Sequence, residues 1–168
     1  SRGLGDVYKR QILEHLLIEQ LAAFYEVGEH NICRLRGADW NDALDMAAER
    51  GESVAFTCAY AGNLRVLAGM ILLLEKTTGS KTTQVLEELL VLCGDQTETF
   101  DDARAKQTIL TQYAARCAHQ ISGKRVEVCL SDLADSLEQK ADWLTGWLRK
   151  HEWICAGTAE GWYLSLIH

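Results

Sequence analysis

Proline is absent from this sequence of 168 residues. A proline inside a helix removes a hydrogen bond and clashes with the preceding turn, at a cost of about 3 kcal/mol, so a chain without proline suits a helical structure. C-x-x-C pairs are also absent, and no histidine stands at metal-ligand spacing beside any of the six cysteines. These absences favour free, buried thiols in a reducing compartment, and we expect no metal site.

An excess of basic residues is also lacking, since the formal net charge is -7 and the isoelectric point is near 5.2. A nucleic-acid surface needs a basic patch, so we expect no nucleic-acid partner; small neutral or weakly charged ligands fit better. No uninterrupted apolar run approaches the roughly 20 residues of a membrane span. With 48% hydrophobic and 24% charged residues, the composition predicts a soluble, cytoplasmic globular protein that does not contact a membrane.

The two ends of the chain share one unusual property. Residues 1–11 can be encoded by a transposase-type sequencing-library adapter, and the reverse complement of its last codons translates as the final segment, residues 164–168. We therefore expect both segments to be adapter-derived and non-native, and exclude them from fold reasoning. Residues 12–163 are then expected to be an internal part of a longer protein.

Hydrophobic periodicity predicts consecutive antiparallel helices. A helix is expected over residues 12–27, ended by Gly28, and the clearest one over 52–76. A further helix is expected over residues 83–93. Another is expected to begin at Phe100, with an inward face formed by Ala103, Leu110, Ala114, Cys117 and Ile121. A last helix is expected to end at about Lys150, with an inward face formed by Leu130, Leu133, Leu137, Ala141, Leu144 and Leu148. Residues 124–128 are predicted to be briefly extended, and 154–163 to form a loop.

Acidic residues, an indole and an amide crowd into residues 36–45, which interrupt the helical sequence and are followed at once by 49–54. Asp39 is a plausible helix N-cap, with a short helix continuing to Gly51. Acids at the start of a helix also stabilise it through the macrodipole, about 0.3–1 kcal/mol each, so Asp39, Asp42 and Glu52 have a purely structural explanation as well.

The sequence on both sides of this segment contains further short motifs. Glu14-His15, Gly28-Glu29-His30, the run from Gly37 to Leu44 (GADWNDAL) and Gly51-Glu52-Ser53-Val54 follow in this order. Together they resemble the catalytic-loop region of the inverting glycoside phosphorylases related to cellobiose phosphorylase, whose pattern is approximately E-H, then G-D-W-N-D-G-M, then G-E-S-V. The resemblance is strongest from residue 13 to about 74 and looser beyond. Ala38 and Ala43-Leu44 depart from the pattern, so the subgroup and substrate stay open.

This resemblance implies an all-α fold, a partial (α/α)6 barrel, in the catalytic domain. It implies that Asp42 is the general acid, that Trp40 lines the sugar subsite and that Asn41 helps to hold the loop. It also implies reversible, inverting phosphorolysis of a β-linked gluco-oligosaccharide to an α-sugar 1-phosphate. The partners would be an oligosaccharide and inorganic phosphate, the latter as co-substrate, with no other cofactor. A homodimer is left open for the longer protein, and the isolated segment is expected to be inactive.

The chemistry agrees with a single acid in this segment. Hydrolases use two carboxylates, whereas a phosphorylase needs only one because phosphate is itself the nucleophile. The acid must hold a proton near neutral pH, so we expect burial against Trp40 to raise the pKa of Asp42 more than a helix N-terminus lowers it. Two alternatives remain open: an inverting hydrolase with a second carboxylate about 6.5–9.5 Å from Asp42, and a helical scaffold without chemistry.

Other residue types have mainly structural explanations. Trp143, Trp147, Trp153 and Trp162 could form a sugar-stacking platform, but the spacing of the first two favours helix packing. His15, His30, His119 and His151 are expected on the surface or in loops. Glu87, Glu88, Asp101 and Asp102 are expected at solvated helix ends, and Arg34 and Arg36 are weaker candidates for an anion contact near the motif.

Overall fold

A computed structural model describes residues 2–35, 50–94, 96–157, 160–164 and 166–167. The fold is mostly helical, as predicted. Its helices are α1 (Arg2–Tyr25), α2 (Val54–Thr78), α3 (Leu90–Cys93), α4 (Ala103–Cys117) and α5 (Leu130–His151). Its strands are β1 (Glu52–Ser53), β2 (Thr82–Leu86), β3 (Arg125–Cys129), β4 (Trp153–Cys155), β5 (Gly161–Tyr163) and β6 (Leu166–Ile167). Short 3-10 turns cover Glu87–Leu89 and Thr97–Thr99.

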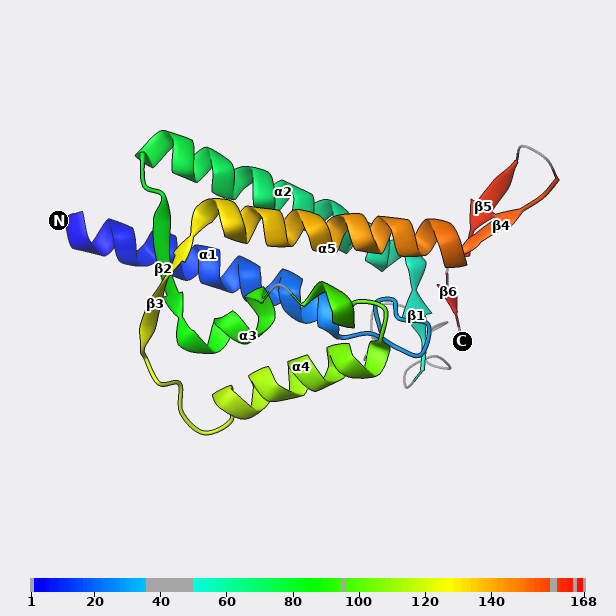
Figure 1. Ribbon diagram of the computed structural model, residues 1–168, viewed down its shortest axis with the longest axis horizontal. Helices are drawn as coiled ribbons and strands as arrows, with labels where there is room; N and C mark the ends of the chain where they lie inside the picture. Colours follow the sequence, from blue (N-terminus) through cyan, green and yellow to red (C-terminus); the bar gives the residue numbers. More distant parts are fainter. Residues whose placement is uncertain (1, 36–49, 95, 158–159, 165, 168) are drawn as a thin grey trace.

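The long helices lie lengthwise beside one another (Figure 1). α2 runs antiparallel to α1, and α5 runs back along α2 in the most extensive pairing between the described elements. α4 packs along the opposite side of α1, and β2 and β3 cross one end of the bundle. The turn after α1, strand β1 and the C-terminal end of α5 meet at the other end.

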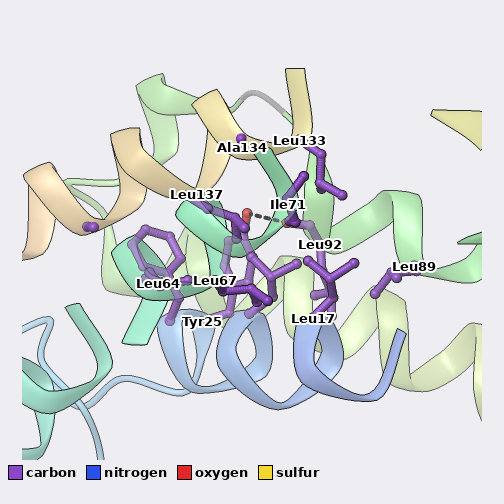
Figure 2. Close-up of a cluster of buried hydrophobic side chains, with 14 of the residues drawn as sticks. Leu17, Tyr25, Leu64, Leu67, Ile71, Leu89, Leu92, Leu133, Ala134 and Leu137 are labelled. Atoms are coloured by element: carbon purple, nitrogen blue, oxygen red, sulfur yellow. Dashed lines mark hydrogen bonds between the residues drawn. The ribbon is translucent and has the colours of Figure 1, made fainter. Parts of the chain in front are cut away.

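The core lies where α1, α2, α3 and α5 converge, and Figure 2 shows its side chains pointing toward one another. Leucines from four helices fill it, among them Leu17, Leu64, Leu92 and Leu137, each fully buried. Tyr25 is buried with them, and its hydroxyl donates to the carbonyl of Leu92 at 3.3 Å. Burial raises the pKa of the Tyr25 hydroxyl, so this group stays a neutral donor.

The predicted inward face of α5 is confirmed. Leu130, Leu133, Leu137, Ala141, Leu144 and Leu148 are all buried. The predicted inward face of α4 is partly right: Ala103, Leu110 and Cys117 are half-buried, and Leu110 packs against the core. Ile121 lies beyond the helix and is exposed, and Ala114 is also exposed. The fully buried residues of α4 are Lys106 and Ile109, so the buried face is centred on the side that holds the polar Lys106.

The helix predicted over 83–93 is wrong in its first half. Residues 82–86 form β2, which pairs antiparallel with β3 from Thr82↔Cys129 to Leu86↔Arg125. Residues 87–89 form a 3-10 turn and only the last four residues of the range are α-helical. The extended conformation predicted for residues 124–128 is confirmed by β3. β-branched residues on both strands favour this pairing. The partner strand lies about forty residues further along the chain, so a local sequence pattern does not reveal the pairing.

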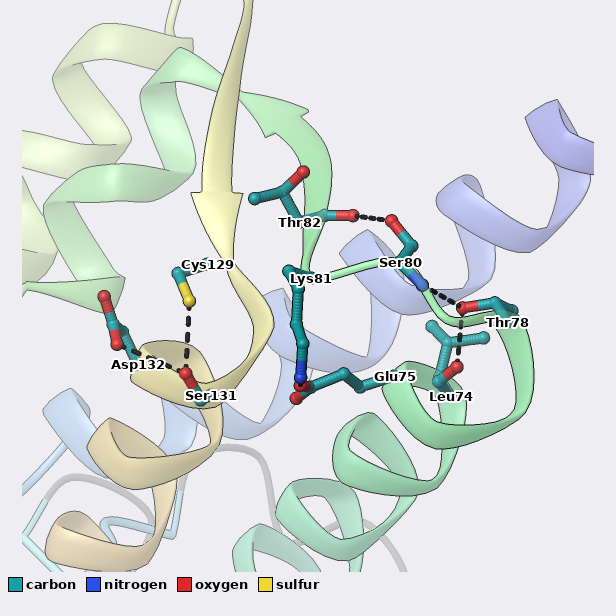
Figure 3. Close-up of polar contacts among 9 residues, drawn as sticks. All are labelled: Leu74, Glu75, Thr78, Ser80, Lys81, Thr82, Cys129, Ser131 and Asp132. Atoms are coloured by element: carbon teal, nitrogen blue, oxygen red, sulfur yellow. Dashed lines mark hydrogen bonds and ion pairs between the residues drawn. The ribbon is translucent and has the colours of Figure 1, made fainter.

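Polar contacts end α2 and direct the chain into β2 (Figure 3). Gly79 takes the left-handed conformation, φ 71°, and donates its N–H to the carbonyl of Glu75 at 2.9 Å. Such a C-cap satisfies a helix carbonyl that would otherwise lack a partner. Lys81 forms an ion pair with Glu75, and the Ser80 hydroxyl donates to the carbonyl of Thr82 at 2.7 Å. The turn is therefore fixed on both sides before β2 begins.

One face of α2 is largely exposed in the described part of the structure. Val66, Met70 and Leu73 on this face are 64%, 54% and 59% exposed. Among the described helices, α2 is the one whose length and composition would allow it to cross a membrane, and a third of its most apolar stretch is buried within the fold. Half of this helix packs against α5, and the other half presents an apolar surface.

Both terminal segments set aside as adapter-derived take part in secondary structure. α1 begins at Arg2, and β6 pairs with β1 through Glu52↔Ile167 and Ser53↔Leu166. All six cysteines are free, as predicted, but their burial is lower than expected: Cys58 and Cys155 are exposed and the other four are half-buried.

Candidate functional site

Glu52 ties the turn after α1 to the start of α2. Its side chain is buried, and its carboxylate accepts the N–H of His30 at 3.0 Å and the N–H of Ile32 at 3.3 Å. Each such charge-assisted hydrogen bond contributes about 1.5–3 kcal/mol in general. Glu52 does stand directly before the N-cap of α2, Ser53, whose hydroxyl accepts the N–H of Phe56 at 3.1 Å. Its hydrogen-bond donors, however, belong to the turn after α1.

Gly28 is required at its position by the same carboxylate. A Cβ atom placed on Gly28 would lie 2.2 Å from Cδ of Glu52, far inside van der Waals contact. The turn that follows closes through the N–H of Gly28 and the carbonyl of Ile32 at 3.1 Å, with Asn31 in the left-handed region at φ 63°. Two of the motifs that carry the resemblance, residues 28–30 and 51–54, thus form one structural unit.

The ends of the motif segment 36–49 meet. Leu35 donates its N–H to the carbonyl of Gly51 at 2.8 Å, and Ser53 donates to the carbonyl of Cys33 at 2.9 Å. Trp40, Asn41 and Asp42 lie between these anchors and outside the described residues, as do Arg36 and the helix predicted after Asp39. The described residues on either side of this segment therefore lie together, on the end of the bundle that holds Glu52.

A polar cleft of about 470 Å³ opens at this end. Side chains and backbone from three separate parts of the chain line it: Gly28, Glu29, His30, Arg34, Arg50, Glu52, Ala103, Arg104 and Gln107. Arg50 pairs with Glu29 at 2.9 Å, but both side chains are about three-quarters exposed, so the pair contributes little to stability. Gln107 donates its amide to the carbonyl of Val27 at 2.7 Å, which holds α4 against the turn.

The sequence predicted only some of the residues that line this cleft. Arg34, considered there for an anion contact, does line the cleft, and His30 is exposed at its edge as expected. Arg50, Arg104 and Gln107 were not considered as site residues. Arg104 and Gln107 stand at i and i+3 on α4, which places them on one helix face, but only the tertiary fold reveals that this face meets the turn after α1.

Other members of the resemblance lie elsewhere. Glu14 is buried at the far end of the bundle, where its carboxylate accepts the N–H of Leu86 at 2.8 Å and pairs with Arg125 at 2.9 Å. Glu88, predicted to be solvated, is buried and accepts the N–H of Ser122 at 2.7 Å. These two acids hold secondary structure together and do not line the cleft.

An aromatic cluster with two buried lysines lies behind the cleft. Nζ of Lys106 is 3.5 Å from the ring centre of Trp143 and 4.3 Å from that of Phe24, and it has no hydrogen-bond partner among the described residues. Burial lowers the pKa of Lys106 to about 6, against the raising effect of nearby Asp101. Lys140 is also fully buried, but it donates to the hydroxyl of Ser136 at 2.7 Å.

The four tryptophans do not form a single platform. Trp143 and Trp147 are stacked at 5.0 Å, and their indole N–H groups donate to Asp101 at 2.7 Å and to the carbonyl of His30 at 3.0 Å, so both serve packing as the spacing favoured. Trp153 lies opposite Tyr163 in the β4–β5 hairpin, and Trp162 lies opposite Ile154. Since adjacent residues of a strand point to opposite faces, Trp153 and Trp162 are separated by the hairpin.

Within the described part of the chain, no group of three or more His, Cys, Asp or Glu side chains is arranged to hold a metal ion. The chemistry that the cleft offers comes from guanidinium, amide and imidazole donors and from carboxylate acceptors. These groups suit hydrogen bonding to hydroxyls and oxyanions. No known protein-family model matches the chain, and no curated protein matches it either.

Proposed function

We propose that residues 12–163 are part of the (α/α)6 catalytic domain of an inverting glycoside phosphorylase related to cellobiose phosphorylase. The reaction is the reversible phosphorolysis of a β-linked gluco-oligosaccharide to an α-sugar 1-phosphate. Asp42 donates the proton to the departing sugar, Trp40 lines the sugar subsite and Asn41 helps to hold the loop. Inorganic phosphate is the co-substrate, and the longer protein is cytoplasmic.

The contact between Glu52 and the Gly28–Ile32 turn carries this proposal. It makes one unit of two short motifs that stand twenty residues apart in the sequence and that match the family pattern independently. If the two motifs matched the family pattern by chance, there would be no reason for Gly28 of one motif to lie against the carboxylate of Glu52 in the other. The motif segment with Asp42 leaves this unit at Leu35 and returns at Gly51, beside the polar cleft.

The exposed face of α2 supports the expectation that this is part of a larger domain. Val66, Met70 and Leu73 are more exposed than large apolar side chains usually are in a complete fold, and they lie on one helix. A further helix of a barrel would cover them. The same surface explains why the isolated segment is proposed to be inactive and prone to associate.

The proposal is tested in the longer protein by assaying phosphate-dependent release of sugar 1-phosphate. Asp42→Asn is expected to abolish turnover while sugar binding remains, because the amide preserves the shape of the side chain but has no proton to donate to the leaving oxygen. Asp45→Asn in the same segment is the matched control. Equal product formation without phosphate would identify a hydrolase, and full activity of the Asp42 variant would remove the acid assignment. Absence of any turnover by the original longer protein would favour the scaffold.

A further inference from the structure

We propose that a small cavity at the β2 end of the bundle binds a single small cation of the ammonium type. The cavity measures about 40 Å³ and lies between α1, the 3-10 turn after β2 and the C-terminal half of α4. This is the end of the bundle opposite the polar cleft (Figure 1). The polar groups that line the cavity are two carboxylates, a phenol and a thiol, from Glu14, Glu88, Tyr113 and Cys117.

Glu88 brings to this cavity a carboxylate oxygen without a partner in the described structure. The residue is 7% exposed, and its Oε1 accepts the N–H of Ser122 at 2.7 Å. Its Oε2 is buried and accepts no hydrogen bond from the described residues. Hydrogen bonds from Ser122 lower the pKa of Glu88, so the carboxyl group is ionised at neutral pH. A buried ionised oxygen is costly unless it is paired, and a cation with N–H donors would pair it.

The charge that needs a partner here is about one unit. The carboxylate of Glu14 is already neutralised, because it pairs with Arg125 at 2.9 Å and accepts the N–H of Leu86 at 2.8 Å. Glu88 forms no ion pair within the described part of the chain, and Arg116 lowers its pKa only weakly. A monovalent cation therefore matches the site better than a divalent one.

The lining favours N–H donors over a metal ion. A hard cation such as Ca²⁺ takes about 6–8 oxygen ligands, and no group of three or more His, Cys, Asp or Glu among the described residues is arranged to hold a metal. An ammonium group needs only a few acceptors, and Glu88, Glu14 and the hydroxyl of Tyr113 provide them. Burial raises the pKa of Tyr113 to about 12, so its hydroxyl stays neutral and adds no second charge.

The size of the cavity limits the ligand. A single water needs roughly 10–15 Å³ of such space, so about three groups of that size fit into 40 Å³. Ammonium fits, and so does a cation with one added methyl group, since aliphatic side chains from α1, β2 and the turn form the rest of the wall. Sugars and larger amines do not fit.

Nuclear magnetic resonance of the 168-residue chain with isotope-labelled ammonium chloride tests the site. A bound ammonium ion that exchanges slowly with water is expected to give its own proton–nitrogen correlation, with nuclear Overhauser effects to the ring of Tyr113. In urea unfolding at matched ionic strength, ammonium chloride is expected to raise the midpoint more than potassium chloride. Potassium is the suitable control because it has a similar size and charge but no N–H donors.

Two matched variants assign the ion to this cavity. Glu88→Gln keeps the shape of the side chain and an acceptor for Ser122, and it should weaken ammonium binding at least about tenfold because the charge is lost. Glu87→Gln makes the same charge change one residue away, where Glu87 pairs with Lys124 at 2.7 Å and does not line the cavity. This control should alter the affinity less than about twofold.

Cys117→Met is a second variant, which fills the cavity without changing the charge and should abolish binding. Unchanged binding in this variant would place the ion elsewhere and overturn the site. Equal losses in the Glu87 and Glu88 variants would show a general charge effect and overturn it as well. Equal stabilisation by the potassium salt, or no signal from a bound ammonium ion, would have the same consequence. These measurements involve neither the polar cleft nor phosphate, so their outcome is independent of the proposed function.

Discussion

Replacing the buried Lys106 by methionine is expected to stabilise the protein. The lysine is fully buried, its amine lacks a hydrogen-bond partner, and aromatic rings surround it. Methionine has a similar length and flexibility and no charge to desolvate. Lys106→Met should therefore keep the packing against Phe24 and Trp143 and remove the cost of burying the amine.

The magnitude follows from the pKa of Lys106, which burial lowers from 10.5 to about 6. At pH 7 the unfolded lysine is charged and the folded one is mostly neutral. The 3.5 units between 10.5 and pH 7 then correspond to about 5 kcal/mol, at about 1.36 kcal/mol per unit. The expected gain in unfolding free energy at pH 7 is thus about 5 kcal/mol.

The gain depends on pH with a definite sign. Between about pH 6 and pH 10.5 the unfolded lysine binds a proton that the folded lysine does not, so raising the pH stabilises the original protein. The methionine variant lacks this contribution. Its advantage should fall from about 5 kcal/mol at pH 7 to about 1 kcal/mol at pH 10.

Urea unfolding followed by circular dichroism at both pH values measures the difference. Other titrating groups are shared by the two proteins and cancel in the comparison. Lys76→Met, at an exposed position of α2, is the control and should change stability by less than about 0.5 kcal/mol at either pH. A Lys106→Met variant that is less stable than the original, or whose advantage does not vary with pH, would refute the reasoning.

Three further predictions concern other parts of the fold. Gly28→Ala should lower the unfolding free energy by about 1–3 kcal/mol in urea titrations, because the added methyl group would collide with Glu52; an unchanged midpoint would contradict this contact. Asp102→Ala should cost about 1 kcal/mol by the same measurement, since two N–H groups at the start of α4 lose their acceptor, whereas Asp102→Asn should cost less. Val66→Glu combined with Leu73→Lys should reduce self-association in analytical ultracentrifugation without changing helix content, and association of equal strength would locate the contact elsewhere.

The sequence predicted the elements whose burial is encoded locally. α5 repeats leucine and alanine at spacings of three and four, and every one of its predicted inward positions is buried. The start of α2 is an equally local signal. These features depend on residues within one or two turns of each other, so a pattern in one sequence can identify them.

The features that the sequence did not predict depend on distant partners. Residues 82–86 form a strand because Arg125–Cys129 pairs with them. Lys106 of α4 points inward, where its amine lies over the rings of Phe24 and Trp143. The same holds for the cleft. The motifs indicated which part of the chain holds the candidate functional residues. That Arg34, Arg50 and Arg104 line one cleft depends on how α4 packs against the turn after α1.

The pairing of α2 with α5 also affects how the protein is made. About fifty residues separate the end of α2 at Thr78 from the start of α5 at Leu130. A ribosome adds roughly 5–20 residues per second, so for about 3–10 s the nascent chain presents α2 before its partner has been synthesised. During that interval the helix is apolar on both sides, which makes it a strong candidate for capture by a chaperone that recognises nascent apolar segments.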